Sequence, residues 1–465
     1  MFSAIGSGVY GLKNHIILSV LSHVAPQGVL LLIFIYLSTV LEATEFGRYV
    51  IYESYIVIMS AIITLGADKV LERFGNQNVS VMYYSATRSI FCSVAVSLIF
   101  FVYFTMFELP LFGLSILEIV LLNCASLAYC LVILCSSFLL GNIYTKEIML
   151  LRISRVSIYA VTIILIKDFD TATIFLKVAP EFISGIVSVA VMIFILRRKH
   201  SEVLFKINKS AELHLRYAIP FIIAVTCSLA ITQLDKLILT NYLSLGDIGI
   251  LGYAQKYIAI YLIVGGAFSA VFAPIFYQGN GKNRIMLDYN LAVLFAGAVL
   301  SMTIGGAFFH LLFPTQYQIG IDLFILMMVG AFLSIATSYS SVLVLLNKER
   351  SWANMVTGFL AAVVFLVFLT RLAPTYLLLA PVISFNISAF FLVSVQTVLI
   401  RKYDFRFHTI LYASILFFLS LLYVSQGGKY LVGIVAFNLQ VFSGVAALLS
   451  SIMLLYYLNK IWYLK

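Results

Sequence analysis

The chain has 465 residues, of which 63% are hydrophobic and 10% charged, with a mean hydropathy of +1.08. Soluble proteins carry about 25% charged residues, so this composition excludes a soluble globular protein. The net charge of +10 comes from 29 Lys and Arg against 19 Asp and Glu. These basic residues lie in short loops rather than in one patch, which argues against a nucleic-acid partner.

Apolar runs of about 20 residues are long enough to span a bilayer, and fourteen runs of this kind follow one another along the chain. They lie at residues 16–37, 49–67, 89–107, 115–140, 149–166, 173–196, 217–240, 248–275, 287–313, 319–346, 353–370, 376–400, 409–424 and 430–458. We therefore predict an all-α polytopic membrane protein with about 14 transmembrane helices. Twelve is the alternative, because the last two runs need not both span.

The distribution of basic residues predicts the orientation of these spans. With the N-terminus in the cytoplasm, 22 of the 29 Lys and Arg fall in cytoplasmic segments and 5 on the outer side, as the positive-inside rule requires. Both termini are then cytoplasmic.

Two stretches repeat each other at a fixed offset of 202 residues. Leu41-x-x-x-Glu45-Phe46-Gly47 recurs as Leu243-x-x-x-Asp247-Ile248-Gly249. Two similar halves are typical of transporters, in which two lobes rock around a site between them. We therefore predict an N-lobe at 1–200, a C-lobe at 201–405 and two appended helices with a cytoplasmic tail at 406–465, with a central cavity between the lobes.

Prolines inside apolar runs are candidate hinges for this movement, because proline removes a backbone donor and kinks a helix. The candidates are Pro26, Pro220 and Pro274, and local packing is the alternative for each. His23 lies deep in the first run and could couple transport to protons. It could equally be a hydrogen-bonded packing residue.

The region around the seventh and eighth runs resembles a known family. Thr232-Gln-Leu-Asp235-Lys236 is followed by a short loop and by Gly249-Ile-Leu-Gly-Tyr253. This pattern, together with Glu45-Phe-Gly-Arg-Tyr49, resembles the O-antigen repeat-unit flippases of the multidrug/oligosaccharidyl-lipid/polysaccharide exporter superfamily. The helix start typical of that family is a Gly-x-Tyr-like pattern, from which this chain departs by an insertion of one residue.

The resemblance implies a carrier, not an enzyme, that moves undecaprenyl-diphosphate-linked oligosaccharide from the cytoplasmic to the periplasmic leaflet by alternating access. It implies no cofactor, with H+ or Na+ as candidate coupling ions. The expected partners are the lipid-linked oligosaccharide, membrane lipid, and a glycan polymerase with its chain-length regulator.

A diphosphate that crosses hydrocarbon needs cations inside the membrane, where charges are costly and usually functional. The candidate substrate-binding residues are Lys236, Lys256, Arg152, Arg155 and Arg48. The candidates for ion coupling or ion pairing are Asp235, Glu118, Glu53, Glu181 and His23, of which Glu118 has no obvious local partner.

Structural roles are the alternatives for several of these charges. Asp235 could pair with Lys256 and fix the hairpin of runs seven and eight, and Arg152 and Arg155 could reach lipid headgroups. Lys177 and Glu181 are four residues apart on one helix and are expected to pair.

Two other functions remain open. One is a cation-coupled multidrug exporter of the same fold, although the first run lacks an acidic residue. The other is a membrane polysaccharide polymerase or ligase, although the outer loops are short and no P-loop is present. The five cysteines show no CxxC spacing, so no metal site is predicted.

Overall fold

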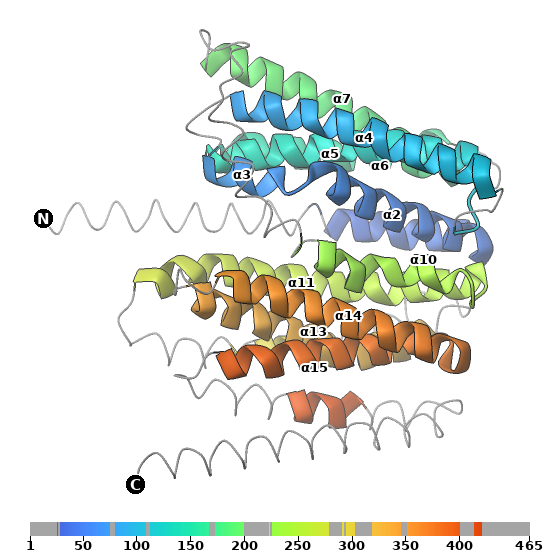
Figure 1. Cartoon of the computed structure of the whole chain (residues 1–465), viewed down its shortest axis with the longest axis vertical. Helices are drawn as coiled ribbons and strands as arrows, with labels where there is room; N and C mark the ends of the chain where they lie inside the picture. The colour runs from blue at the N-terminus through green and yellow to red at the C-terminus, as the bar shows by residue number, and fades with distance from the viewer. Residues whose placement is uncertain are drawn as a thin grey trace, which may run out of the picture.

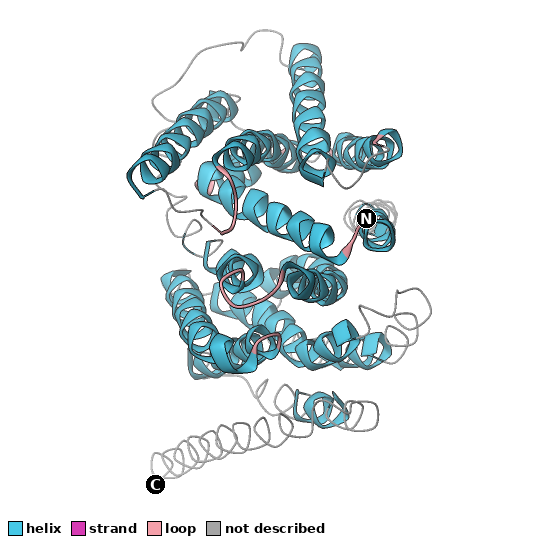
Figure 2. Ribbon diagram, turned by 90° about the vertical axis from the view of Figure 1, so that its right-hand side faces the viewer, coloured by secondary structure: helices cyan, strands magenta, loops and turns pink. Residues whose placement is uncertain are grey.

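The structure is a computed structural model that describes residues 26, 28–74, 80–107, 112–142, 144–166, 173–199, 223, 226–278, 291–292, 294–302, 319–345, 351–399 and 413–420. The regular elements within these ranges are all helices (Figure 2). Apolar sequence with intact internal hydrogen bonding is what a bilayer demands of a spanning segment. The chain is an all-α polytopic membrane protein, and about fourteen spans fit this fold.

With one exception, the main helices of the described residues follow the predicted runs in order. They are Gly28–Val40, α2 (Ala43–Thr64), α3 (Ala67–Phe74), α4 (Ser80–Phe107), α5 (Ile116–Gly141), α6 (Thr145–Leu165), α7 (Thr173–Lys199), η1 (Ala230–Leu234), α10 (Asp235–Leu239), α11 (Leu245–Gln278), α13 (Ile319–Leu345), α14 (Ser351–Tyr376) and α15 (Leu379–Leu399). In the described part, five helices are long and apolar enough to cross a membrane by themselves. Several shorter apolar helices accompany them.

Hydropathy placed the helices well but missed their ends. The run predicted at 49–67 corresponds to α2, which begins at Ala43 and carries Glu45 in its first turn. Carboxylates favour the positive end of the helix dipole, so a helix can begin within polar sequence. The short helix α3 was not predicted, because its charged sequence separates it from the apolar run before it.

The helices form two groups that meet along α2 and α11. Helices α4 to α7 lie on one side of α2, and α13 to α15 lie on the far side of α11 (Figure 1). The hydrophobic core runs through both groups. The lobe boundaries predicted at 200/201 and 405/406 lie outside the described residues, so the exact division stays a prediction.

Candidate functional site

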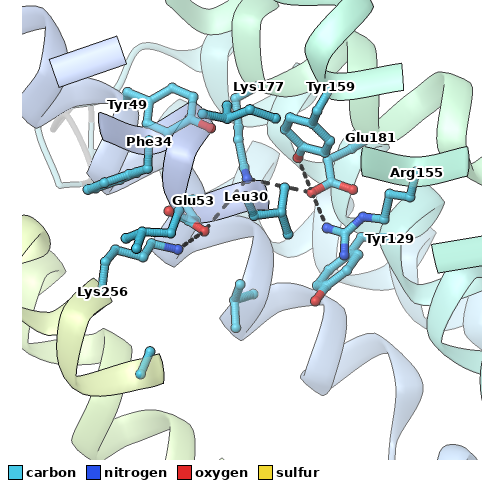
Figure 3. A pocket seen from close by; sticks show the side chains of 14 residues that line it. Leu30, Phe34, Tyr49, Glu53, Tyr129, Arg155, Tyr159, Lys177, Glu181 and Lys256 are labelled. Atoms are coloured by element: carbon cyan, nitrogen blue, oxygen red, sulfur yellow. Dashed lines mark hydrogen bonds and ion pairs between the residues drawn. The ribbon is translucent and has the colours of Figure 1, made fainter. Parts of the chain in front are cut away.

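A polar cavity lies inside this apolar bundle. It has a volume of about 110 Å³ and lies between helix Gly28–Val40, α2, α5, α6, α7 and α11. The charged side chains in its wall are Glu53, Arg155, Lys177, Glu181 and Lys256, as Figure 3 shows. The aromatic side chains in its wall are Phe34, Tyr49, Tyr129 and Tyr159.

Glu181 on α7 is the centre of one half of this site. Its carboxylate accepts a hydrogen bond from Arg155 Nη2 at 2.8 Å and another from the hydroxyl of Tyr159. Lys177, one turn earlier on α7, lies 3.6 Å away, as the i, i+4 spacing predicted. Only 1% of the Glu181 side chain is exposed. All three partners contact its Oε1 and compensate its charge, whereas Oε2 is buried without a hydrogen-bond partner.

Glu53 on α2 is the centre of the other half. Its Oε1 accepts a hydrogen bond from Lys256 Nζ on α11 and lies 3.8 Å from Lys177 Nζ. Lys177 therefore lies between the two carboxylates, and Lys256 brings a charge from the second helix group into the cavity (Figure 3).

Aromatic rings cover the cationic groups. The Arg155 guanidinium lies 4.4 Å from the centre of the Tyr129 ring. Lys177 Nζ lies 5.0 Å from the Tyr159 ring, and Lys256 Nζ lies 5.3 Å from the Phe34 ring. Ring faces attract cations, so these rings help to hold three positive charges in an apolar bundle.

The cavity wall carries an excess of positive charge. Three cations (Arg155, Lys177, Lys256) against two carboxylates (Glu53, Glu181) leave a formal charge of +1. Such a wall attracts an anion, and its rings offer flat apolar faces to a sugar.

The structure thus brings together four predicted site residues: Glu53, Arg155, Glu181 and Lys256. The alternative that Arg155 reaches lipid headgroups would require it to lie near the cytoplasmic end of its span. It lies in the middle of α6, ten residues after Thr145 and ten before Leu165. That alternative is wrong because α6 begins four residues before the apolar run does.

Arg48 and Glu118 lie away from the cavity. Arg48 is half exposed and lies 3.7 Å from Glu45. Glu118 has clear partners, contrary to expectation: it forms a capping box with Ser115 at the start of α5 and accepts a hydrogen bond from Tyr52. The Ser-x-x-Glu spacing is the signature that could have predicted this.

Asp235 and Lys236 are buried at the junction of η1 and α10, outside the cavity wall. Lys236 donates to the Thr232 carbonyl at 2.8 Å and to Gln233 Oε1 at 3.1 Å. Asp235 accepts a hydrogen bond from Gln255, whereas Lys256 pairs with Glu53. The predicted Asp235–Lys256 pair is therefore wrong, although α10 and α11 are indeed joined by a side-chain contact from Asp235.

The other predicted residues are placed as follows. Arg152 is partly exposed on α6 and is absent from the cavity wall. Pro26 is buried at the start of the described chain, and Pro274 lies within α11. His23 and Pro220 lie outside the described residues.

The aromatic part of the site was not predicted from the sequence. Tyr159 follows Arg155 by four residues on α6, and Tyr49 precedes Glu53 by four on α2. Residues four apart share a helix face, so this spacing could have selected these two tyrosines. Tyr129 and Phe34 reach the cavity only through tertiary packing, which the sequence does not reveal.

The comparison with known families decides what kind of protein this is. The profile of the polysaccharide biosynthesis protein family matches residues 12–280, more than half of the chain. The chain belongs to that family. The match includes helix Gly28–Val40 and α2 to α11, and therefore every charged residue of the cavity wall.

Solved structures show the same fold at low sequence identity. An inward-facing multidrug resistance MATE family transporter of the MOP superfamily is similar, with a TM-score of 0.61 and 12% identity over 86% of this chain and 95% of that one. The lipid II flippase MurJ in an inward closed conformation matches with a TM-score of 0.57 and 13% identity, over 97% of this chain and 99% of that one.

A MOP superfamily transporter from Pyrococcus furiosus matches with a TM-score of 0.52 and 13% identity, over 89% of this chain and 96% of that one. No curated protein sequence matches the chain significantly. The chain is thus a member of the polysaccharide biosynthesis protein family with a multi-pass membrane architecture, and its fold is similar to that of these solved transporters and of the solved flippase.

Proposed function

We propose that this protein flips an undecaprenyl-diphosphate-linked oligosaccharide, of the O-antigen repeat-unit type, from the cytoplasmic to the periplasmic leaflet of a bacterial inner membrane. The observation that carries the proposal is the positively charged, ring-lined cavity between α2, α6, α7 and α11. Membership of the polysaccharide biosynthesis protein family supports it. So does the likeness in fold to a lipid II flippase.

Each part of the substrate finds a matching chemistry. The diphosphate suits Lys177, Lys256 and Arg155, because ammonium and guanidinium groups form strong charge-assisted hydrogen bonds with phosphate. The sugars suit the tyrosine rings and their hydroxyls. A cavity of about 110 Å³ is too small for a whole oligosaccharide, so the cavity must widen during transport, as alternating access requires.

Coupling to H+ or Na+ belongs to the same proposal. Glu53 and Glu181 are the carboxylates in the cavity wall, and an intramembrane carboxylate is the usual carrier of a coupled proton. The net positive wall disfavours the cationic drugs that a multidrug exporter would carry, since like charges repel.

Analysis of lipid-linked sugars in a deletion strain, with the two leaflets resolved, tests the proposal. We expect diphosphate-linked repeat units to accumulate on the cytoplasmic face while long surface glycan disappears. If single units instead reach the periplasmic side without being polymerised, the protein acts after flipping and the proposal fails. A strain with normal glycan and increased drug sensitivity would favour the exporter.

A further inference from the structure

Helices α2 and α11 touch backbone to backbone near their first turns. A Cβ atom at Gly47 would lie 1.8 Å from the carbonyl oxygen of Leu245, and one at Gly252 would lie 2.4 Å from Val50 Cγ1. A Cβ at Gly249 would lie 3.3 Å from the backbone nitrogen of Gly47. Gly47 and Gly249 occupy equivalent places in the 202-residue repeat, so each helix group contributes the same glycine to this contact. We call the contact of Gly47, Gly249 and Gly252 the α2–α11 seam.

The cavity begins just beneath this seam. Glu53 follows Gly47 by six residues and Lys256 follows Gly249 by seven. With a rise of about 1.5 Å per residue, the ion pair lies about 9–10.5 Å deeper than Gly47 and Gly249. In the predicted topology the seam faces the periplasm, so it closes the exit of the cavity.

The Glu53–Lys256 pair joins the two helix groups at this depth. In the described part of the chain it is the ion pair that crosses from one group to the other, and 35% of the Lys256 side chain is exposed. A further cross-group polar contact from α2 is the hydrogen bond from Ser54 Oγ to Gln233 Oε1, at 3.0 Å. Much of the directional attraction across the cavity therefore depends on the Glu53 carboxylate.

Glu53 also has a second cation within reach. Lys177, on the same side of the seam as Glu53, lies 3.8 Å away. If Lys256 is taken by another anion, Glu53 keeps a partner and no buried carboxylate is left uncompensated. The cost of breaking the cross-group pair is thereby reduced, because an unpaired buried charge is expensive.

We propose that Glu53 acts as a built-in counter-anion that closes the α2–α11 seam, and that a diphosphate group opens the seam by taking Lys256 from Glu53. This inference rests on the proposed function for its ligand. A diphosphate carries more negative charge than one carboxylate and binds the same ammonium group. Once Lys256 binds the diphosphate, the seam has lost its ionic link. The substrate itself then shifts the two helix groups toward the open state.

The test is the rate of disulfide formation across the seam. A Cβ built at Gly246 lies 3.5 Å from Ala43 Cβ, which is within the range of disulfide geometry. The pair Ala43→Cys and Gly246→Cys is made in a full-length chain whose five native cysteines are replaced, and the protein is reconstituted in lipid. Crosslinking by a mild oxidant then reports how long the seam stays closed.

Three probes separate the effect of the diphosphate charge from the effect of the lipid tail. They are undecaprenyl diphosphate, uncharged undecaprenol and inorganic pyrophosphate. We expect undecaprenyl diphosphate to slow crosslinking about tenfold, a shift of about 1.4 kcal/mol toward the open state, and undecaprenol to have no effect. A response to pyrophosphate alone would show that the diphosphate acts without its lipid chain. The disulfide should block transport, and a reducing agent should restore it.

Two variants test the role of Glu53. Glu53→Gln should slow crosslinking without any ligand and should remove most of the ligand effect, and Lys256→Gln should do the same. Glu45→Gln, a carboxylate change on the same helix that faces Arg48 and Thr173, is the matched control and should behave like the parent. If Glu53→Gln crosslinks as fast as the parent, the proposal that Glu53 keeps the seam closed is refuted.

The effect of the ligand can be tested separately from the role of the Glu53–Lys256 pair in closing the seam. Suppose that Glu53→Gln slows crosslinking but bound undecaprenyl diphosphate does not change crosslinking of the parent. Opening of the seam by the substrate is then refuted, while closure of the seam by the Glu53–Lys256 pair stands. If undecaprenyl diphosphate fails to bind at all, measured by its retention on the purified protein, the proposed function falls and opening of the seam by the substrate falls with it.

Discussion

At the scale of single residues, the cavity is held together by shared carboxylates rather than by separate ion pairs. Glu181 serves Arg155, Lys177 and Tyr159, and Glu53 serves Lys177 and Lys256. A buried charge pair adds little net stability, but the loss of one partner strands the other charges. The effect of each substitution should therefore depend on how many partners it strands.

Glu181→Gln should be the most destabilising of the carboxylate changes. It removes the charge that compensates Arg155 and Lys177 in a buried position, where losing a partner costs about 3–5 kcal/mol. Thermal unfolding of the purified protein should show a clearly lower midpoint. Glu45→Gln, whose partner Arg48 is half exposed, should cost less than about 1 kcal/mol; equal midpoints for the two variants would show that Glu181 does not organise the site.

Arg155 and Arg152 were both predicted to bind phosphate, but only Arg155 lines the cavity. Arg155→Gln should reduce transport at least tenfold, a loss of about 1.4 kcal/mol or more, because it removes a guanidinium held by Glu181 and Tyr129. Arg152→Gln, three residues earlier on the same helix, should change transport less than about twofold, because its partly exposed side chain does not line the cavity and interactions of such charges contribute little. Complementation of a deletion strain measures both, and the reverse order of effects would contradict the placement of the site.

At the scale of helices, hydropathy predicts existence and order, and local polar chemistry determines the ends. The runs at 115–140 and 173–196 correspond closely to α5 and α7, because about 20 apolar residues can form little else in a bilayer. The start of α2 and the capping box of α5 depend instead on single residues such as Glu45 and Ser115. Their signals are short and are easily overlooked beside a long apolar run.

Two glycine changes should have opposite effects, because Gly47 lies in the close contact of α2 with α11 whereas Gly358 on α14 lies in open space. Gly47→Ala would place a methyl group 1.8 Å from the Leu245 carbonyl oxygen, so it should force the seam apart and impair transport. Gly358→Ala on α14 has nothing within 4 Å of the new atom and should stabilise the helix by up to about 1 kcal/mol. Transport and thermal midpoint are measured for both, and tolerance of Gly47→Ala would mean that the seam is not tightly closed.

At the scale of the whole molecule, the sequence shows that there are two halves but not which faces meet. The 202-residue repeat predicts a paired architecture, and the observed fold is similar to that of a solved transporter. The helices are apolar on nearly all sides, so periodicity does not reveal which side of α2 faces α11. For that reason the sequence could propose Glu53 and Lys256 separately as site residues, but not as partners.

The predicted topology can be checked directly. With both termini cytoplasmic, the turn between α10 and α11 lies outside, and Asn241 in that turn is exposed. Asn241→Cys in a cysteine-free chain should react with a membrane-impermeant thiol reagent in cells whose outer membrane is permeabilised and whose inner membrane is intact. His200→Cys, in the predicted cytoplasmic segment, should react only after the inner membrane is opened, and labelling in the opposite order would invert the topology.

The central claim is that this chain moves a diphosphate-linked lipid across a bilayer by means of the charged cavity. The most direct measurement uses proteoliposomes that hold a labelled undecaprenyl-diphosphate sugar, with a reagent that detects the label only in the outer leaflet. We expect the intact protein to bring the inner-leaflet pool to the reagent, and Arg155→Gln to slow this at least about tenfold. Equal rates in protein-free liposomes, or in the Arg155→Gln variant, would contradict the account.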